Sequence, residues 1–259
     1  MSPARSARPL LLLPPSETKV SGGRTVGAPG RFDDILETPR ALVARALAET
    51  LERADDRRVA TLLNVSAARV EEAREVTAAA ARGSGPLLPS WRRYEGVVWG
   101  HLRPAEVTPG HRRRLLIPNA LYGLNAGSDP VAEYRLKFTV SLEGLGPLAR
   151  FWREHLGRAL DEMGRVEIID LLPDEHHRAI DWTALRRPRY QRVRFVSADE
   201  SSVVGHDAKA AKGALARHLL DAGAPGLGTF EWRGWRSVRR GDDYVVLAPS
   251  SPARHEGFS

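Results

Sequence analysis

The sequence predicts a mixed α/β (α+β) fold with a mixed sheet, surrounding helices and a helix-hairpin-helix-like element. Three observations support this prediction. Short apolar runs indicate buried strands, longer amphipathic stretches indicate helices, and the two alternate without a regular strand–helix–strand rhythm. A chain of 259 residues, 42% hydrophobic and 27% charged, is long enough to bury a core. We therefore expect one domain over residues 1–259, with a helical subregion at about 39–82.

The N-terminal apolar run predicts a buried strand rather than a targeting segment. Leu10–Leu13 follows two arginines but ends after four residues at Pro14 and Pro15, too early for a signal peptide or a membrane span. The chain has no cysteine, which excludes disulfides, thiolate zinc sites and cysteine nucleophiles. These features favour a soluble, cytoplasmic protein with no membrane partner.

Residues 39–82 predict a group of helices. Thr38 is suited to cap the first helix, with Pro39 in its first turn, and Ser66 is suited to cap a later one after the interruption "NVS". A tight turn between two helices can contact a phosphate backbone, and it can also be an ordinary packed pair. The Gly-, Ser- and Pro-rich residues 82–90 predict a loop that separates this part from the rest.

Beyond residue 90 the pattern predicts further strands and helices. Residues 115–117 indicate a strand broken by Pro118, and 145–164 an amphipathic helix with one apolar stripe. We expect a buried strand over 166–172, a hairpin of 190–197 with 201–206, a basic helix over 207–222, and a C-terminal hairpin of 229–238 with 242–248.

The charge balance favours anionic partners. Lysines and arginines number 39 against 32 acidic residues, a net charge of +7. The alternative is that a GC-rich genome places arginines on solvated surfaces. Four lysines remain, and we expect them where a compact amine is needed. They are Lys19, Lys137, Lys209 and Lys212.

The stretch "VVGHDAKAAKGALARHLL" (203–220) predicts a strand that leads into a basic helix. With Asp207 as the N-cap, Lys209 and Lys212 share one face beside the free N–H groups of the first turn. Gly213 in the helix interior indicates that something approaches closely. This combination suits a phosphate or carboxylate, although an exposed basic face is the alternative. It is not a P-loop, because the glycines do not precede the lysines as that motif requires.

Two other segments contain candidate ligand-binding residues. Ser16, Glu17 and Lys19 follow the first strand, where open-sheet folds often bind ligands. Two phenols and a guanidinium around a glycine-rich loop can clamp a planar anion, or the tyrosines can belong to the core. These last residues are Tyr122, Tyr134 and Arg135.

An acidic and histidine-rich cluster follows the strand at 166–172. Asp174 and Glu175 precede His176 and His177, and such residues can hold a metal or act as an acid/base pair. Adjacent histidines point apart on regular elements, so we predict neither a metal site nor a cofactor here.

The chain resembles the YaaA family of bacterial peroxide-stress proteins over nearly its full length, closest to an actinobacterial form. The matching segments are "LLPPSETK" (12–19), "NALYGL" (119–124) followed by "YRL" (134–136), "FW" (151–152), "DLLPDE" (170–175) and "KAAKGALARHLL" (209–220). Their order and spacing carry the resemblance.

The resemblance implies a single-domain fold with a helix-hairpin-helix-like element, a positively charged cleft, DNA binding, and protection against peroxide by lowering available intracellular iron. It also implies that the cleft is lined by Lys19, Tyr122, Tyr134, Arg135, Lys209, Lys212 and Gly213. The sequence departs from the family pattern at His206 and Asp207, which can form an acid/base unit beside Lys209.

Two function hypotheses follow. In the first, the protein acts in the peroxide stress response and binds DNA or another anion in the basic cleft. In the second, it is a divergent enzyme acting on a small anionic or nucleobase-like substrate, with His206, Asp207 and Lys209 as catalytic candidates. The expected partners are DNA or a small phosphate, nucleotide or carboxylate ligand, and the sequence indicates no oligomeric state.

Overall fold

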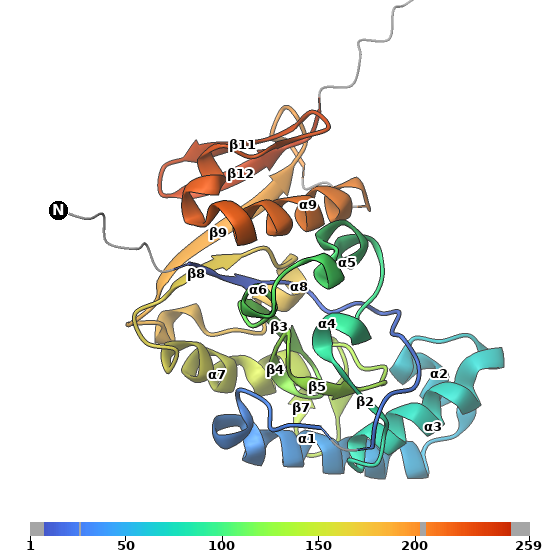
Figure 1. Ribbon diagram of the computed structural model, residues 1–259. Helices are drawn as coiled ribbons and strands as arrows, with labels where there is room; N and C mark the ends of the chain where they lie inside the picture. Colours follow the sequence, from blue (N-terminus) through green and yellow to red (C-terminus); the bar gives the residue numbers. More distant parts are fainter. Residues whose placement is uncertain (1–7, 26, 203–205, 250–259) are drawn as a thin grey trace, which may run out of the picture.

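The fold is built on a central mixed sheet (Figure 1). It is seen in a computed structural model that describes residues 8–25, 27–202 and 206–249. For residues 206 and 207 only the backbone is described. Within these residues, eight strands pair in the order β10-β11-β12-β9-β8-β1-β3-β4. Their bounds are β1 (Leu10–Leu12), β3 (Leu115–Asn119), β4 (Gly123–Ala126), β8 (Glu167–Asp170), β9 (Arg189–Val196), β10 (Glu231–Trp232), β11 (Trp235–Arg240) and β12 (Asp243–Leu247).

The middle of the sheet is parallel and its edges are antiparallel. β1 pairs in parallel with both β3 and β8, and the parallel pairing continues from β8 through β9 to β12. β4 closes one edge antiparallel to β3, and β11 and β10 close the other. This arrangement confirms the predicted mixed α/β fold.

Helices cover both faces of the sheet (Figure 1). α1 (Asp33–Arg53), α3 (Val70–Ala81) and α7 (Leu148–Asp161) pack in one core with Leu10 and Leu12. α5 (Val97–Leu102) and α9 (His206–Ala222) pack in the other with Leu11 and Leu13. Successive side chains of a strand point to opposite faces, so a strand with helices on both sides is apolar throughout.

Shorter elements fill the connections. They are α2 (Asp56–Leu63), α4 (Ser90–Arg93), α6 (Pro109–Arg112) and α8 (Asp174–His177), with the two-stranded pairs β2 (Leu87–Pro89) with β5 (Pro130–Ala132) and β6 (Ser141–Leu142) with β7 (Gly146–Pro147). No helix among the described residues is both long and apolar enough to cross a membrane.

The first long helix begins earlier than predicted. α1 starts at Asp33, and Pro39 lies buried inside it rather than in its first turn behind a Thr38 cap. Asp33 and Asp34 place negative charge at the helix N-terminus, where the helix dipole favours it. Pro39 has no backbone N–H and so removes one hydrogen bond from the interior of this helix.

A loop was predicted over residues 82–90, but part of this stretch is a strand. Leu87–Pro89 forms β2, which pairs antiparallel with β5. A strand of three residues forms because of its distant pairing partner, and its own sequence shows no clear strand pattern. This explains why β2 was not predicted. The helices before it share one core with the sheet, since Leu47 and Val70 belong to the same cluster as Leu116.

Other boundaries also differ from the predictions. β3 continues through Pro118 to Asn119, and β9 pairs in parallel with β8 and β12 rather than with a hairpin partner. Ser202 closes a turn onto Ser197, and residues 203–205 lie outside the described part. The predicted 207–222 helix begins at His206, so Asp207 lies within α9 instead of capping it.

Gly213 allows α9 to lie directly against α5. A Cβ at this position would overlap the carbonyl oxygen of Val98 and lie 2.8 Å from Cβ of His101. The close approach that was expected at Gly213 is therefore the approach of a neighbouring helix, not of a ligand. Gly213 does not line the cavity described below.

We expect Gly213→Ala to lower the free energy of unfolding by about 1–3 kcal/mol, because the two helices must separate. Chemical denaturation measures this change. Gly100→Ala on α5 is the matched control, since its Cβ would meet no atom within 4 Å and should cost nothing or stabilise by up to about 1 kcal/mol. Equal stability of the two variants would contradict the helix-contact role of Gly213.

Candidate functional site

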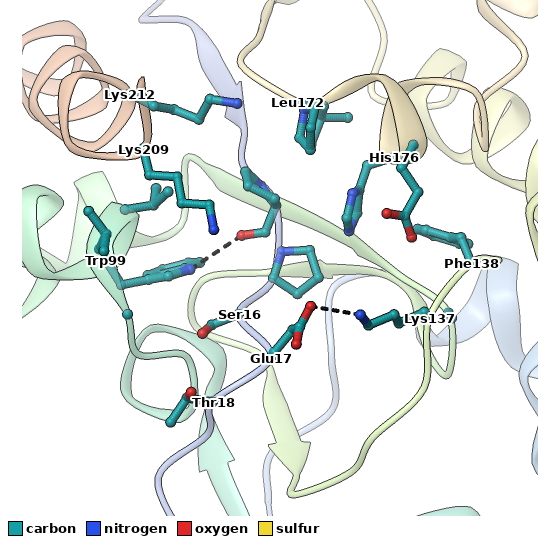
Figure 2. Close-up of a pocket in the computed structure, with 18 of the residues that line it drawn as sticks. Ser16, Glu17, Thr18, Trp99, Lys137, Phe138, Leu172, His176, Lys209 and Lys212 are labelled. Carbon is teal, nitrogen blue, oxygen red and sulfur yellow. Dashed lines mark hydrogen bonds and ion pairs between the residues drawn. The ribbon is translucent and has the colours of Figure 1, made fainter. Parts of the chain in front are cut away.

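A cavity of about 980 Å³ opens at the carboxyl ends of the parallel strands. The segments after β1 and β8, Pro14–Lys19 and Leu172–His176, form its floor and one wall, and α9 contributes another (Figure 2). The next strand of the main sheet after β1 is β3, which pairs along one side of β1. β8 comes later in the chain and pairs along the other side of β1. Such a switch point is where open α/β sheets most often bind ligands.

All four lysines of the chain line this one cavity. Lys19 follows β1, Lys137 precedes β6, and Lys209 and Lys212 project from α9. Figure 2 shows the two α9 lysines facing Lys137 and His176 across the cavity. Three arginines join them, namely Arg135, Arg192 and Arg194. The lysines that the sequence singled out thus converge from three separate segments.

Lys212 is a buried amine. It is 8% exposed, its Nζ lies 5.3 Å from the centre of the Phe195 ring, and among the described residues it makes no hydrogen bond or ion pair. Burial lowers the pKa of Lys212 to about 8, although the charges of Asp170 and Asp174 partly oppose this. Such an ammonium is costly unless an anion accompanies it.

Lys19 is held between a carbonyl and an aromatic face. Its Nζ donates to the Ser16 carbonyl oxygen at 2.9 Å and lies 4.3 Å from the centre of the Tyr134 ring. Burial, followed by the charge of Arg135, lowers the pKa of Lys19 to about 7. A large fraction of this amine is therefore neutral near neutral pH.

The predicted tyrosine clamp is divided between two places. Tyr134 is buried beside the cavity, and its hydroxyl lies 3.2 Å from the hydroxyl of Tyr94. Tyr122 packs edge-on against Tyr134, but its hydroxyl accepts a hydrogen bond from the Ala132 N–H at 3.2 Å and does not line the cavity. Burial raises the pKa of all three phenols, so they remain neutral.

The remaining acidic candidates line the cavity and are paired with cations. Glu17 pairs with Lys137 at 2.8 Å, and this hydrogen bond lowers the pKa of Glu17. Asp174 pairs with the Arg192 guanidinium at 2.5 Å. Glu175 and Ser16 also belong to the lining, whereas the side chains of His206 and Asp207 lie outside the described part.

His176 is a cavity residue that the prediction left without a role. Its ring packs edge-on against Phe138, and its buried Nδ1 has no partner among the described groups. Burial, followed by the charges of Lys212 and Lys137, lowers the pKa of His176 to about 4. It is therefore a neutral imidazole among cations. Adjacent histidines were the available signal, and only the fold shows which one enters the cavity.

His177 faces away from the cavity and anchors α8. Its Nδ1 lies 2.7 Å from the buried Asp170 carboxylate, which also accepts from the Tyr190 hydroxyl and the Leu172 N–H. Trp182 stacks on the imidazole of His177. This network fixes the turn that carries Asp174 and His176. Within the described residues, no group of three or more His, Asp or Glu side chains can hold a metal ion.

Comparison with known proteins identifies the family. Residues 10–238 match the family described as "Peroxide stress protein YaaA". The chain belongs to the YaaA family. This confirms the resemblance that rested on short segments such as 12–19 and 209–220, both of which line the cavity in part.

The YaaA relatives include several UPF0246 proteins of similar length. One from Streptomyces coelicolor is 32% identical over 240 residues, covering 86% of each chain. One from Corynebacterium efficiens is 29% identical over 214 residues, covering 81% of this chain and 84% of the relative. Another, from Corynebacterium glutamicum, is 29% identical over 219 residues.

We expect Lys212→Met to raise the free energy of unfolding at pH 7 by about 1–3 kcal/mol, because it removes the desolvation cost of the ammonium. Between pH 8 and 10.5 the unfolded wild-type chain binds more protons at this lysine than the folded chain does. The wild type therefore gains stability as the pH rises, and the advantage of the variant shrinks across that window.

Denaturation at pH 7 and pH 9.5 measures both effects, with the exposed Lys209→Met as the control that shows neither. A Lys212→Met variant that is less stable than the wild type at pH 7 would contradict the uncompensated burial of this amine.

Proposed function

We propose that this YaaA-family protein binds a small anionic ligand, a phosphate or a carboxylate, in the lysine-lined cavity. The observation that carries the proposal is the convergence of all four lysines on one cavity in a chain whose other basic residues are arginines. A lysine presents a compact ammonium with three donors, which suits a small anion held inside a cavity. The position at the strand switch point supports the same conclusion.

The energetics of Lys212 favour an anionic occupant. Its nearest acidic neighbours are engaged elsewhere, since Asp170 accepts from His177 and Asp174 pairs with Arg192. An anion placed beside Lys212 and Lys209 would supply the missing counter-charge, and in a partly dry cavity that interaction is stronger than at the surface.

The geometry supports a small ligand better than a DNA duplex. Lys212 is buried at the cavity wall, where the phosphate backbone of a duplex does not reach, whereas Lys209 is exposed. Duplex binding would therefore depend on Lys209 and the exposed arginines, and it would weaken steeply with salt. The helical pair α2 and α3 stays the expected place for such a contact.

The cellular role that we propose follows the family description. The protein would act in the cytoplasm, in the response to peroxide stress, through the ligand held in this cavity. A strain that lacks the gene should survive hydrogen peroxide less well than its parent. Wild-type protein should restore survival, and Lys212→Met should not, although it folds.

We expect Lys212→Met to weaken the binding of lactate or inorganic phosphate by about tenfold or more, because a charge-assisted hydrogen bond contributes about 1.5–3 kcal/mol. Isothermal titration measures the dissociation constants. The conservative Lys212→Arg variant separates charge from shape, since the longer fork should restore affinity only in part.

A labelled DNA duplex provides the contrasting probe, with anisotropy measured over a range of salt concentrations. We expect Lys212→Met to leave duplex binding unchanged. If neither small anion binds the wild type, and duplex affinity falls with Lys212→Met, the cavity is a nucleic-acid site and the proposal is wrong.

A further inference from the structure

Lys19 occupies a different part of the cavity wall from the α9 lysines and is unusually fixed. Its backbone bridges to Tyr94, its Nζ donates to Ser16 O at 2.9 Å, and the ring of Tyr134 covers one side at 4.3 Å. An ammonium has three donor hydrogens, and only this one hydrogen bond occurs among the described residues. The amine therefore has a defined direction, and among the described residues its other N–H groups have no acceptor, so they are available to a ligand in the cavity.

The nearest carboxylates do not neutralise Lys19. Glu17 is held by Lys137 at 2.8 Å, and Glu133 forms no ion pair with Lys19 in the part of the chain that is described. Arg135 places a second positive charge beside the amine. A partly dehydrated lysine next to another cation is an environment in which enzymes obtain a nucleophilic amine.

Arg135 is well placed to hold the acidic group of a ligand. It lines the cavity, and its backbone N–H donates to Thr77 Oγ1 at 3.1 Å, which fixes the chain at this point. Its guanidinium makes no hydrogen bond within residues 8–25, 27–202 and 206–249. A free guanidinium can bind a carboxylate through two parallel hydrogen bonds.

We propose that Lys19 forms an imine with the carbonyl group of a small 2-oxo acid whose carboxylate is bound by Arg135. This inference rests on the proposed anion-binding function and names the class of its ligand. Because Lys19 and Arg135 line the same cavity, one small acid can offer its carbonyl to the amine and its adjacent carboxylate to the guanidinium, whereas a simple phosphate has no group for Lys19 to attack.

The reaction balances without an oxidant or a reductant. The lone pair of neutral Nζ attacks the carbonyl carbon, a C–N bond forms, and the carbonyl π electrons move to oxygen. A proton passes from nitrogen to that oxygen, and the hydroxyl leaves as water after it takes a proton from solvent. The iminium that results carries one N–H, whose proton it keeps or returns to solvent, so the net reaction replaces the carbonyl oxygen with the lysine nitrogen and releases one water.

The protonation equilibrium of Lys19 agrees with this geometry. Burial and the charges of Arg135 and Arg93 lower the pKa of Lys19 to about 7, against the opposing charges of Glu133 and Glu17. Tyr94 and Tyr134, which also face the amine, stay neutral because burial raises their pKa values. At pH 7 about half of Lys19 carries a lone pair, against about one in 10³ for an ordinary exposed lysine.

The test is reductive trapping in the full-length protein. Pyruvate with cyanoborohydride at pH 7 should attach to Lys19 at least about tenfold faster than to the exposed Lys209, since the larger neutral fraction outweighs the lower basicity. Peptide mapping assigns the adduct among four lysines and the terminal amine. Arg135→Gln should remove most of this preference, and acetaldehyde, which has no carboxylate, should show little of it.

Two variants probe the environment of the amine. Lys19→Arg should abolish the adduct at this position. Lys137→Ala frees Glu17, which can then pair with Lys19, so the pH at which trapping is half-maximal should rise. The exposed Arg82→Ala, outside the cavity lining, should leave it unchanged. The wild-type map is informative even if a variant fails to fold.

Equal trapping at Lys19 and Lys209, or trapping that ignores Arg135→Gln, would overturn the inference. Lactate cannot form an imine, so its binding reports the proposed function alone. Lactate binding that depends on Lys212, without trapping at Lys19, would refute only the inference. Trapping at Lys19 without lactate or phosphate binding would refute only the site proposed at Lys212.

Discussion

The parallel pairing of β1 with β3 on one side and β8 on the other is the constraint on which the site depends. Leu12 is opposite Leu116 in one neighbour and Asp170 in the other. The segments that leave β1 and β8 diverge beyond this point, because the next strand of the main sheet after β1 is β3, toward one edge, and the next after β8 is β9, toward the other. The space between them becomes the cavity, and the polar residues after each strand become its lining.

The position of α9 follows from the same sheet and from one glycine. Its apolar residues pack over the face that carries Leu11 and Leu13, and Gly213 lets it lie against α5. Lys209 and Lys212 are thereby set above the carboxyl ends of the strands. The cavity then gives two amines different surroundings, since the charges of Asp170 and Asp174 act on the buried Lys212, whereas the charge of Arg135 acts on the half-buried Lys19. Groups of one chemical type acquire different protonation behaviour in this way.

The sequence predicted correctly those elements whose formation is visible in the pattern of their own residues. Leu10–Leu12 and the 148–161 helix were predicted because burial on both faces, or on one stripe, leaves a clear apolar pattern. The start of α1 and the strand β2 were missed, because a proline is typical of a first helical turn but Pro39 lies inside α1, and because Leu87–Pro89 is a strand only through its pairing with β5. Neither cause is visible within a short window of sequence.

The sequence by itself determined the fold class, the family and the unusual scarcity of lysine. It also marked Gly213 as a point of close approach, without showing that α5 is what approaches. Only the tertiary structure decided that Lys137 shares the cavity that the resemblance assigned to Lys19, Lys209 and Lys212, that His176 enters it, and that Tyr122 does not. The physical reason is that convergence depends on strand order and helix packing, and these are set by long-range burial that no local pattern records.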